Sequence, residues 1–484
     1  MFASKTLTAF AWSFLEQGGA KAVQLVVQIV LARLLAPETF GVLAILLVVV
    51  SVADAVAQSG LGMALIQRTN STNEDYSTGF WLSLAIAVAL YAALFLVAPA
   101  FAAFYRMSEL EGLLRVLSLV VILNSVSSIQ RSYLQRSMDF KGLFKANLVA
   151  MLVSGILGIF AALAGWGVWA LIVQTVFQGA CACAVMLVVV PWKPSFSFDP
   201  HVAKELFSYG WKVCVTGILN VLYSGVSELA IGKTCPASDL GYYSQGRKWP
   251  NAAIGIATNA LQNVFFPAFS SLKDGEDASF IAAVRRSLVS GSFVTVPFAL
   301  FFAAAADPAV TLLLGDAWLP CVPVFQMLCI SGSMTLLQVV NLRAYMALGD
   351  SGLYLKLQII KVVVGGVAIA AAAVASRNIY VVSFATMVIG ILSVLLVDLH
   401  PAARVVGYAR SRQLLDLAPV YILAAAAAAA AWAVFFIGLS GFILLVVQAV
   451  VFLLVYAGGA RLFRLAGAAD LACIAEKLAF RKRT

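Results

Sequence analysis

Polar residues recur at helical spacing in two segments of the chain that are otherwise apolar. The first stripe is Ser13, Gln17, Lys21, Gln24 and Gln28, and the second, about 199 positions later, is Lys212, Thr216, Asn220, Tyr223 and Ser227. Steps of four, four, three and four residues keep each stripe on one helix face. Because polar groups in hydrocarbon are costly, each face is expected to meet protein or water. Amides, hydroxyls and one lysine per stripe are suited to binding a polar, anionic solute.

Charged residues inside the same apolar segments extend this candidate site. Lys21 and Asp54 lie at the same depth of two consecutive predicted helices, and an unpaired charge there is costly, so we expect an ion pair. The pair is either static or broken when a ligand or a proton binds. Arg247 and Lys248 either line a cavity or extend to the membrane interface, and Lys361 is expected to extend to the interface.

The candidate site residues are all polar or charged and all lie within apolar segments. The substrate-binding candidates are Lys21, Lys212, Gln17, Gln24, Asn220, Gln58, Arg247, Lys248 and Asn259, and the candidates for ion coupling are Glu16, Asp54 and Glu228. No cofactor or metal is predicted, because Cys181-x-Cys183 lacks a second pair of ligands and neither histidine has a partner motif.

The composition requires a membrane environment for the elements that carry these residues. The 484 residues are 62% hydrophobic and 11% charged, with a mean hydropathy of +0.98. Apolar runs of about 18 to 28 residues are long enough for helices to cross roughly 30 Å of hydrocarbon. The net charge of +10 does not indicate nucleic-acid binding, because the basic residues stand at the ends of the apolar runs. The chain is therefore predicted to be an all-α integral membrane protein.

About fourteen transmembrane helices are predicted. Their approximate ranges are 8–34, 41–66, 78–104, 111–135, 146–164, 168–190, 207–233, 246–271, 284–306, 323–347, 355–375, 379–397, 416–437 and 441–461. Lysine and arginine concentrate in the loops of one side, which predicts that both termini are cytoplasmic. The spacing of the polar stripes divides the chain into two six-helix bundles. Since six is even, both enter the membrane in the same direction, as a parallel repeat about the membrane normal.

The predicted division of the chain has five parts. They are an N-terminal bundle (1–190), a cytoplasmic interfacial linker (191–206), a C-terminal bundle (207–400), helices 13 and 14 (401–465) and a basic amphipathic tail (466–484). The linker and the tail combine aromatic or aliphatic residues with polar and basic ones, which predicts helices lying on the inner leaflet.

Several local motifs resemble those of the polysaccharide exporters in the multidrug/oligosaccharidyl-lipid/polysaccharide superfamily. They are 31–41 (LARLLAPETFG), Asp54 with 60–68 (GLGMALIQR), 134–140 (LQRSMDF), 266–270 (FPAFS) and 240–243 (LGYY). The likeness spans roughly residues 1 to 400, and the chain looks like a Wzx-type flippase of the colanic-acid or teichuronic-acid exporter group.

That resemblance implies a function in the bacterial cytoplasmic membrane. It implies translocation of an undecaprenyl-pyrophosphate-linked oligosaccharide from the inner to the outer leaflet by alternating access, with the lipid bilayer and the polysaccharide polymerase or export machinery as partners. It does not imply an enzyme. A multidrug or cation antiporter of the same superfamily is one alternative, and a membrane polysaccharide polymerase or ligase is another. The external loops are short and poor in acids, which disfavours the polymerase.

Overall fold

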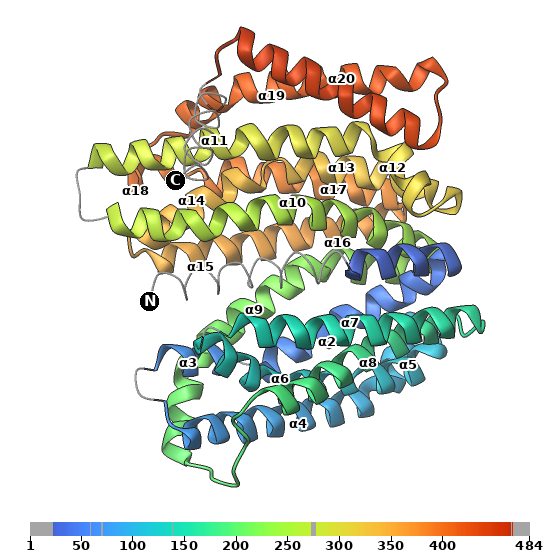
Figure 1. Ribbon diagram of the computed structural model, residues 1–484, viewed down its shortest axis with the longest axis vertical. Helices are drawn as coiled ribbons and strands as arrows, with labels where there is room; N and C mark the ends of the chain where they lie inside the picture. The colour runs from blue at the N-terminus through green and yellow to red at the C-terminus, as the bar shows by residue number, and fades with distance from the viewer. Residues whose placement is uncertain are drawn as a thin grey trace, which may run out of the picture. The chain divides into compact units, whose positions relative to one another are not determined.

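The computed structural model is helical and consists of two compact units, Met1–Gly241 and Tyr242–Thr484 (Figure 1). The structure describes residues 23–58, 60–68, 71–137, 139–272, 277–465 and 467. These units are defined by packing, whereas the five-part division above follows the sequence repeat and stays a prediction.

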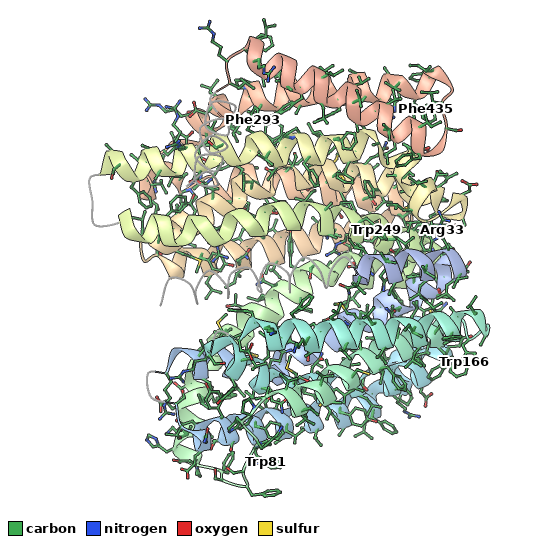
Figure 2. All side chains as sticks on the ribbon, in the orientation of Figure 1. Arg33, Trp81, Trp166, Trp249, Phe293 and Phe435 are labelled. Atoms are coloured by element: carbon green, nitrogen blue, oxygen red, sulfur yellow. The ribbon has the colours of Figure 1, made fainter. Side chains whose placement is uncertain are left out.

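The first unit is a bundle of long helices joined by short turns. After a helix at Val23–Leu34 come α2 (Pro37–Gln58), α3 (Leu61–Gln67), α4 (Asn73–Tyr105), α5 (Glu109–Leu117), α6 (Leu119–Arg136), α7 (Phe140–Leu163), α8 (Val168–Val189) and α9 (Pro200–Thr234). Helix α6 packs against both α4 and α8, α7 packs against α8, and α9 packs against α2 (Figure 1). Figure 2 shows Trp166 at one end of this unit and Trp81 toward the other, and aromatic side chains are typical of membrane interfaces.

The second unit has more interruptions in its helices. It comprises most of α10 (Ala237–Leu272), then α11 (Asp277–Ala304), α12 (Ala306–Leu313), η1 (Asp316–Cys321), α13 (Val322–Gly332), α14 (Thr335–Ala347), α15 (Ser351–Ile360), η2 (Lys361–Gly365), α16 (Gly366–Ser376), α17 (Ile379–Leu392), η3 (Ser393–Asp398), α18 (Ala402–Val405), α19 (Arg410–Ala433), η4 (Val434–Ile437) and α20 (Gly441–Leu462). The segments η2 and η3 are π-helical, so α15 to α16 and α17 to η3 each follow one continuous path. Helix α19 packs between α11 and α20.

The membrane architecture predicted from composition is confirmed. Within the described residues, twelve helices are long and apolar enough to cross a membrane, and they correspond to predicted spans two to seven and nine to fourteen. Two further helices, Val23–Leu34 and α10, lie where the first and eighth spans were predicted. The chain is a multi-pass membrane protein, and the count of fourteen spans stays a prediction.

The linker between α8 and α9 differs from its prediction. Residues 191–199 form no helix, and α9 begins only at Pro200. The Trp192 ring is buried, and its centroid lies 5.7 Å from that of the Tyr76 ring. The Trp81 indole N–H donates a hydrogen bond of 2.8 Å to the Ser195 carbonyl. These contacts hold the linker against α4 and replace the backbone bonds of a helix. The predicted helical tail lies outside the described residues.

Two glycines 200 positions apart in the sequence lie where two helices approach each other closely. Gly41 lies in the first turns of α2, and Gly241 lies in the first turns of α10. A Cβ atom on Gly41 would lie 1.9 Å from the Ala237 carbonyl oxygen, and one on Gly241 would lie 1.9 Å from the Pro37 carbonyl oxygen. The starts of α2 and α10 therefore cross at a distance that only glycine permits.

Replacing either crossing glycine with alanine is expected to destabilise the protein by about 1–3 kcal/mol, because the backbones must separate to admit the methyl group. Gly458→Ala in α20 is a matched control, since a Cβ there meets no atom within 4 Å. Thermal unfolding of the purified chain in detergent measures the difference. Equal melting temperatures for Gly41→Ala and Gly458→Ala would contradict the close crossing.

Candidate functional site

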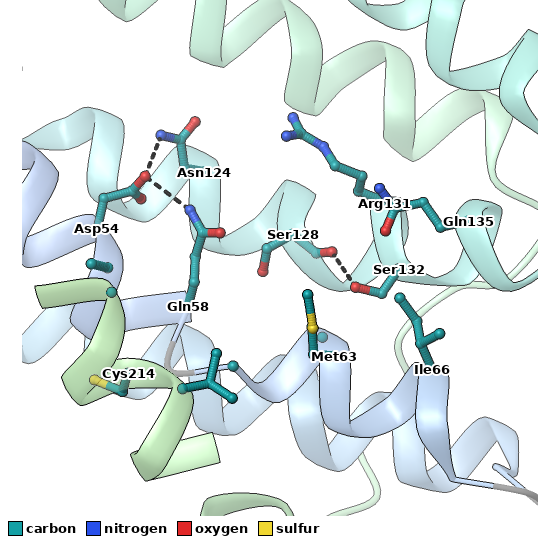
Figure 3. A pocket seen from close by; sticks show the side chains of 15 residues that line it. Asp54, Gln58, Met63, Ile66, Asn124, Ser128, Arg131, Ser132, Gln135 and Cys214 are labelled. Atoms are coloured by element: carbon teal, nitrogen blue, oxygen red, sulfur yellow. Dashed lines mark hydrogen bonds between the residues drawn. The ribbon is translucent and has the colours of Figure 1, made fainter. Parts of the chain in front are cut away.

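A polar cavity of about 430 Å³ lies inside the first unit, between α2, α3, α6 and α9 (Figure 3). Its polar lining residues are Asp54, Gln58, Asn124, Ser128, Arg131, Ser132 and Gln135. Every one of these side chains comes from a helix that is apolar enough to cross a membrane. Polar side chains in such helices cost free energy unless they contact water, protein or a ligand. The cavity is therefore the first candidate for a functional site.

Asp54 is held by two amide side chains at one end of this cavity. Its Oδ2 atom accepts a hydrogen bond from Gln58 Nε2 at 2.8 Å and another from Asn124 Nδ2 at 3.3 Å. Its Oδ1 atom is buried and has no hydrogen-bond partner among the described residues. A buried carboxylate oxygen without a donor is costly, so this atom is positioned to accept a bond from a lysine, a proton or a ligand hydroxyl.

Helix α6 supplies most of the polar lining because its polar residues share one face. Asn124, Ser128, Arg131 and Gln135 are separated by four, three and four residues, the spacing of adjacent turns. Gly62 allows α3 to approach this face, since a Cβ there would lie 2.3 Å from Ser132 Oγ. The residue before α3, Gly60, adopts a left-handed φ of 65° that directs the chain from α2 into α3.

Arg131 provides the positive charge of the cavity. It makes no hydrogen bond or salt bridge with any described residue, and its side chain is exposed to the cavity. Arg131 follows Asn124 by seven positions, so its Cα atom lies about 10 Å further along α6. Figure 3 shows it displaced from the Asp54 cluster along the helix. The cavity therefore has a carboxylate and amide end, suited to hydroxyl groups, and a guanidinium end, suited to phosphate oxygens.

The structure brings some of the predicted site residues together. Asp54 and Gln58 lie one helical turn apart in predicted span two. Their side chains hydrogen bond to each other, and both line the cavity. Gln24 is half-buried in the helix Val23–Leu34, and Gln28, one turn further on, is buried. Asn220 is exposed on α9, and Glu228 is half-buried two turns later. The prediction that these residues share one cavity stays a prediction.

The remaining candidates cannot be placed in this cavity. Glu16, Gln17 and Lys21 lie outside the described residues, so the predicted Lys21–Asp54 ion pair does too. Lys212 and Asn259 lie in α9 and α10, but their side chains are outside the described part. Arg247 is half-buried and Lys248 is exposed on α10, in the second unit.

Lys361 corrects a prediction. It does not extend to the membrane interface; its side chain is 2% exposed, and its Nζ atom lies 2.9 Å from Asp398 Oδ1. Lys361 begins the π-helical segment η2, and Asp398 ends the π-helical segment η3. Burying the pair satisfies both charges, whereas extension of the lysine would leave Asp398 unpaired at 0% exposure.

The cavity residues of α6 were not among the predicted site residues, although the sequence carries a signal for them. A stripe of polar residues at helical spacing runs through the fourth predicted span, just as stripes run through spans one and seven. Arg131 stands near the end of this span, where a basic residue is ordinarily explained by membrane topology, so the stripe alone does not indicate a site.

The chain matches a known protein family. The family described as "Polysaccharide biosynthesis protein" matches residues 30–323, which is more than half of the chain. The succinoglycan biosynthesis transport protein ExoT of Rhizobium meliloti is 26% identical over 68% of this chain and 66% of its own length. The teichuronic acid biosynthesis protein TuaB of Bacillus subtilis is 26% identical over 62% of each chain. The chain thus matches slightly less than two thirds of either relative, and the resemblance predicted from the motifs is confirmed.

A solved structure shares the fold. The lipid II flippase MurJ in an inward closed conformation superposes with a TM-score of 0.74 at 13% identity, covering 93% of this chain and 98% of that chain. Identity at this level carries the fold alone. It confirms that the helices follow the arrangement of a known membrane transporter.

Proposed function

This chain belongs to the polysaccharide biosynthesis protein family, and from that premise we propose that it is a flippase for a lipid-linked oligosaccharide. Its substrate would be an oligosaccharide on undecaprenyl pyrophosphate, moved from the inner to the outer leaflet of the bacterial cytoplasmic membrane for polysaccharide export. The relatives named as a transport protein and a flippase support transport over catalysis.

One observation carries this proposal: a polar cavity with two chemically different ends lies inside helices apolar enough to span the membrane. The substrate has an anionic pyrophosphate and a hydroxyl-rich glycan attached to a long apolar tail. Arg131 suits the pyrophosphate, because a guanidinium binds phosphate oxygens in pairs. Asp54, Gln58 and Asn124 suit sugar hydroxyls, because they combine donors with an acceptor that has no partner in the described part. The tail would remain in lipid.

The rest of the proposed site consists of the cations and polar residues predicted from the sequence. Lys21, Lys212, Arg247 and Lys248 would add positive charge for the pyrophosphate, while Gln17, Gln24, Asn220 and Asn259 would hydrogen bond to the glycan. Glu16, Asp54 and Glu228 would couple transport to an ion gradient. With both termini cytoplasmic, the two bundles would expose this site to each leaflet in turn. Transport could also be driven outward by the polymerase or export machinery, which would remove the product from the outer leaflet.

Reconstitution tests the proposal directly. Proteoliposomes that contain the purified chain are expected to move a fluorescent undecaprenyl-pyrophosphate oligosaccharide to the opposite leaflet faster than empty vesicles. A chemical quencher that cannot cross the membrane reports the movement. No acceleration, together with uptake of a cationic dye against a proton or sodium gradient, would replace the proposal with an antiporter.

Lys21→Ala and Lys212→Ala are each expected to reduce surface polysaccharide several-fold, because each removes a cation from the proposed site. Lys204→Ala is the matched control, since Lys204 is exposed near the start of α9, before the predicted membrane span. Surface glycan is measured in a strain that lacks the native gene, with the protein level followed by immunoblot. Normal glycan in both variants would remove these lysines from the site.

A further inference from the structure

We propose that a second cavity, in the second unit, is a binding site for an anionic phospholipid. It has a volume of about 790 Å³ and lies between α11, α19 and the residues that follow α20. Its lining includes Arg285 and Arg286 of α11, Asp416 of α19, and Arg464. The cavity does not include any residue of the polar cavity around Asp54, and the inference does not depend on the flippase function.

The position of this cavity along its helices is that of a membrane interface. Helix α11 begins at Asp277, α19 begins at Arg410, and α20 ends at Leu462, so the cavity lies where all three helices reach the same side of the unit. Lipid headgroups lie at this depth, with acyl chains below them.

The charges at the cavity are arranged to attract an anion. Three arginines and one aspartate line it, so its formal charge is +2. Arg285 is fixed by a bidentate pair, in which Nε and one terminal nitrogen each donate to Asp416 at 2.7 Å. Tyr408 also donates its hydroxyl to Asp416. Two of the five N–H groups of Arg285 are used in this way, which leaves the others to donate to a phosphate.

Arg464 is held at the cavity by the backbone rather than by an ion pair. It adopts a left-handed φ of 47°, which turns the chain away from α20 and back toward α11. At Gly467 the chain touches α11, because a Cβ there would lie 2.5 Å from Phe293 Cβ; Figure 2 labels Phe293. Arg464 is exposed and makes no salt bridge with a described residue, so its charge is available to a ligand.

The apolar part of the lining selects a lipid over a small anion. Ile281, Val289, Leu415, Pro419 and Val420 line the cavity beside the arginines. Leu415 is 72% exposed and Ile422, two turns further along α19, is 70% exposed. This exposed strip continues the apolar wall along the outside of α19. A phosphate between the arginines would therefore leave its acyl chains on an apolar surface.

Two other occupants fit less well. The chain's own tail, 468–484, contains Lys477, Arg481, Lys482 and Arg483 against Asp470 and Glu476, so it carries the same sign of charge as the cavity. Inorganic phosphate would match the arginines but would leave the apolar wall without a partner. An anionic phospholipid satisfies both parts of the lining.

The test uses the full chain, purified in a neutral detergent and depleted of lipid. Dioleoylphosphatidylglycerol, dioleoylphosphatidylcholine, inorganic phosphate and undecaprenyl pyrophosphate are added separately, and binding is followed by native mass spectrometry and by the melting temperature. We expect phosphatidylglycerol to bind at least about tenfold more tightly than phosphatidylcholine, because the lining as a whole carries a net positive charge. We expect inorganic phosphate to leave the melting temperature unchanged. Equal binding of the two phospholipids, or an equal shift with phosphate alone, would overturn the proposal.

Variants locate the site. Arg286→Gln combined with Arg464→Gln is expected to abolish the preference for phosphatidylglycerol, whereas Arg461→Gln, on the last turn of α20 but outside the cavity lining, is expected to retain it. If the double variant fails to fold, the comparison of lipids on the wild-type chain still tests the proposal. Each single variant is then expected to weaken the preference for phosphatidylglycerol. The assignment would be overturned if these variants kept the full preference for phosphatidylglycerol. It would also be overturned if they lost binding of undecaprenyl pyrophosphate but kept binding of phosphatidylglycerol.

Discussion

Arg131→Gln is expected to lower glycan export by about 10- to 100-fold. Hydrogen bonds to a charged group contribute about 1.5–3 kcal/mol each, and glutamine keeps a polar side chain while removing the charge and shortening its reach. Arg131 is the cation of the cavity around Asp54, and it has no competing salt bridge in the described part of the chain. The charge of Arg131 acts on Asp54 through space without a salt bridge. Its loss is therefore expected to fall mainly on the ligand and to leave the protein folded.

The initial rate of flipping in proteoliposomes measures this effect, and surface glycan in cells supports it. Arg131→Lys is expected to be intermediate, because a lysine retains the charge but cannot form a bidentate pair with a phosphate. Arg115→Gln is the control. Arg115 pairs at 2.9 Å with Glu111 one turn earlier in α5, a partly exposed pair of the kind that contributes little to stability. Flipping by Arg131→Gln at the wild-type rate would show that the phosphate binds elsewhere.

The sequence was sufficient for the membrane helices and insufficient for the linker. Long apolar runs determine where a helix can cross the membrane, because no other structure satisfies the backbone there. The segment at 191–199 has no such constraint. Its conformation depends on the ring of Trp192, which packs against Tyr76 of α4, and on the hydroxyl of Ser77, which accepts a bond from the Ser195 amide at 3.0 Å. Contacts between residues more than 100 positions apart are not contained in local periodicity.

The candidate site was predictable in part, and for a definable reason. Asp54 and Gln58 were identified because a carboxylate in a predicted span requires a partner. Asn124 was not identified, because an amide on another helix could meet Asp54 only through the packing of α2 against α6. The partners of a buried group depend on which faces of two helices meet. Hydrophobic periodicity identifies the buried face of each helix, but it does not show which neighbouring helix that face contacts.

The Lys361–Asp398 pair could have been predicted by the reasoning that led to the Lys21–Asp54 prediction. Lys361 and Asp398 each lie near the same end of consecutive predicted spans, and a buried lysine requires an acid. The pair was missed because a lysine near the end of a span can extend to water at little cost. Only the packing of η2 against η3 shows that this route is closed to it.

Lys361→Met is expected to destabilise the protein by about 3–5 kcal/mol, because it leaves the Asp398 carboxylate buried without its cation. Gln338 Nε2 donates to Asp398 Oδ2 at 2.9 Å, but an amide does not neutralise the charge. The double variant Lys361→Met with Asp398→Asn is expected to recover most of the loss, since no buried charge remains. The melting temperature in detergent measures both changes, and Lys356→Met, exposed one turn or so earlier on α15, is the control.

The double variant also separates a structural role of this pair from a transport role. If the pair only joins η2 to η3, recovery of the melting temperature is accompanied by recovery of glycan export. If the charges themselves change partners during transport, the melting temperature recovers while export remains low, because neutral side chains cannot bind and release a proton or an ion. A Lys361→Met variant as stable as the wild type would contradict the structural role, since it would show that the fold does not need the cation beside Asp398. These outcomes can be distinguished because both groups are buried: at 2% and 0% exposure, neither the Lys361 nor the Asp398 charge can be satisfied by water.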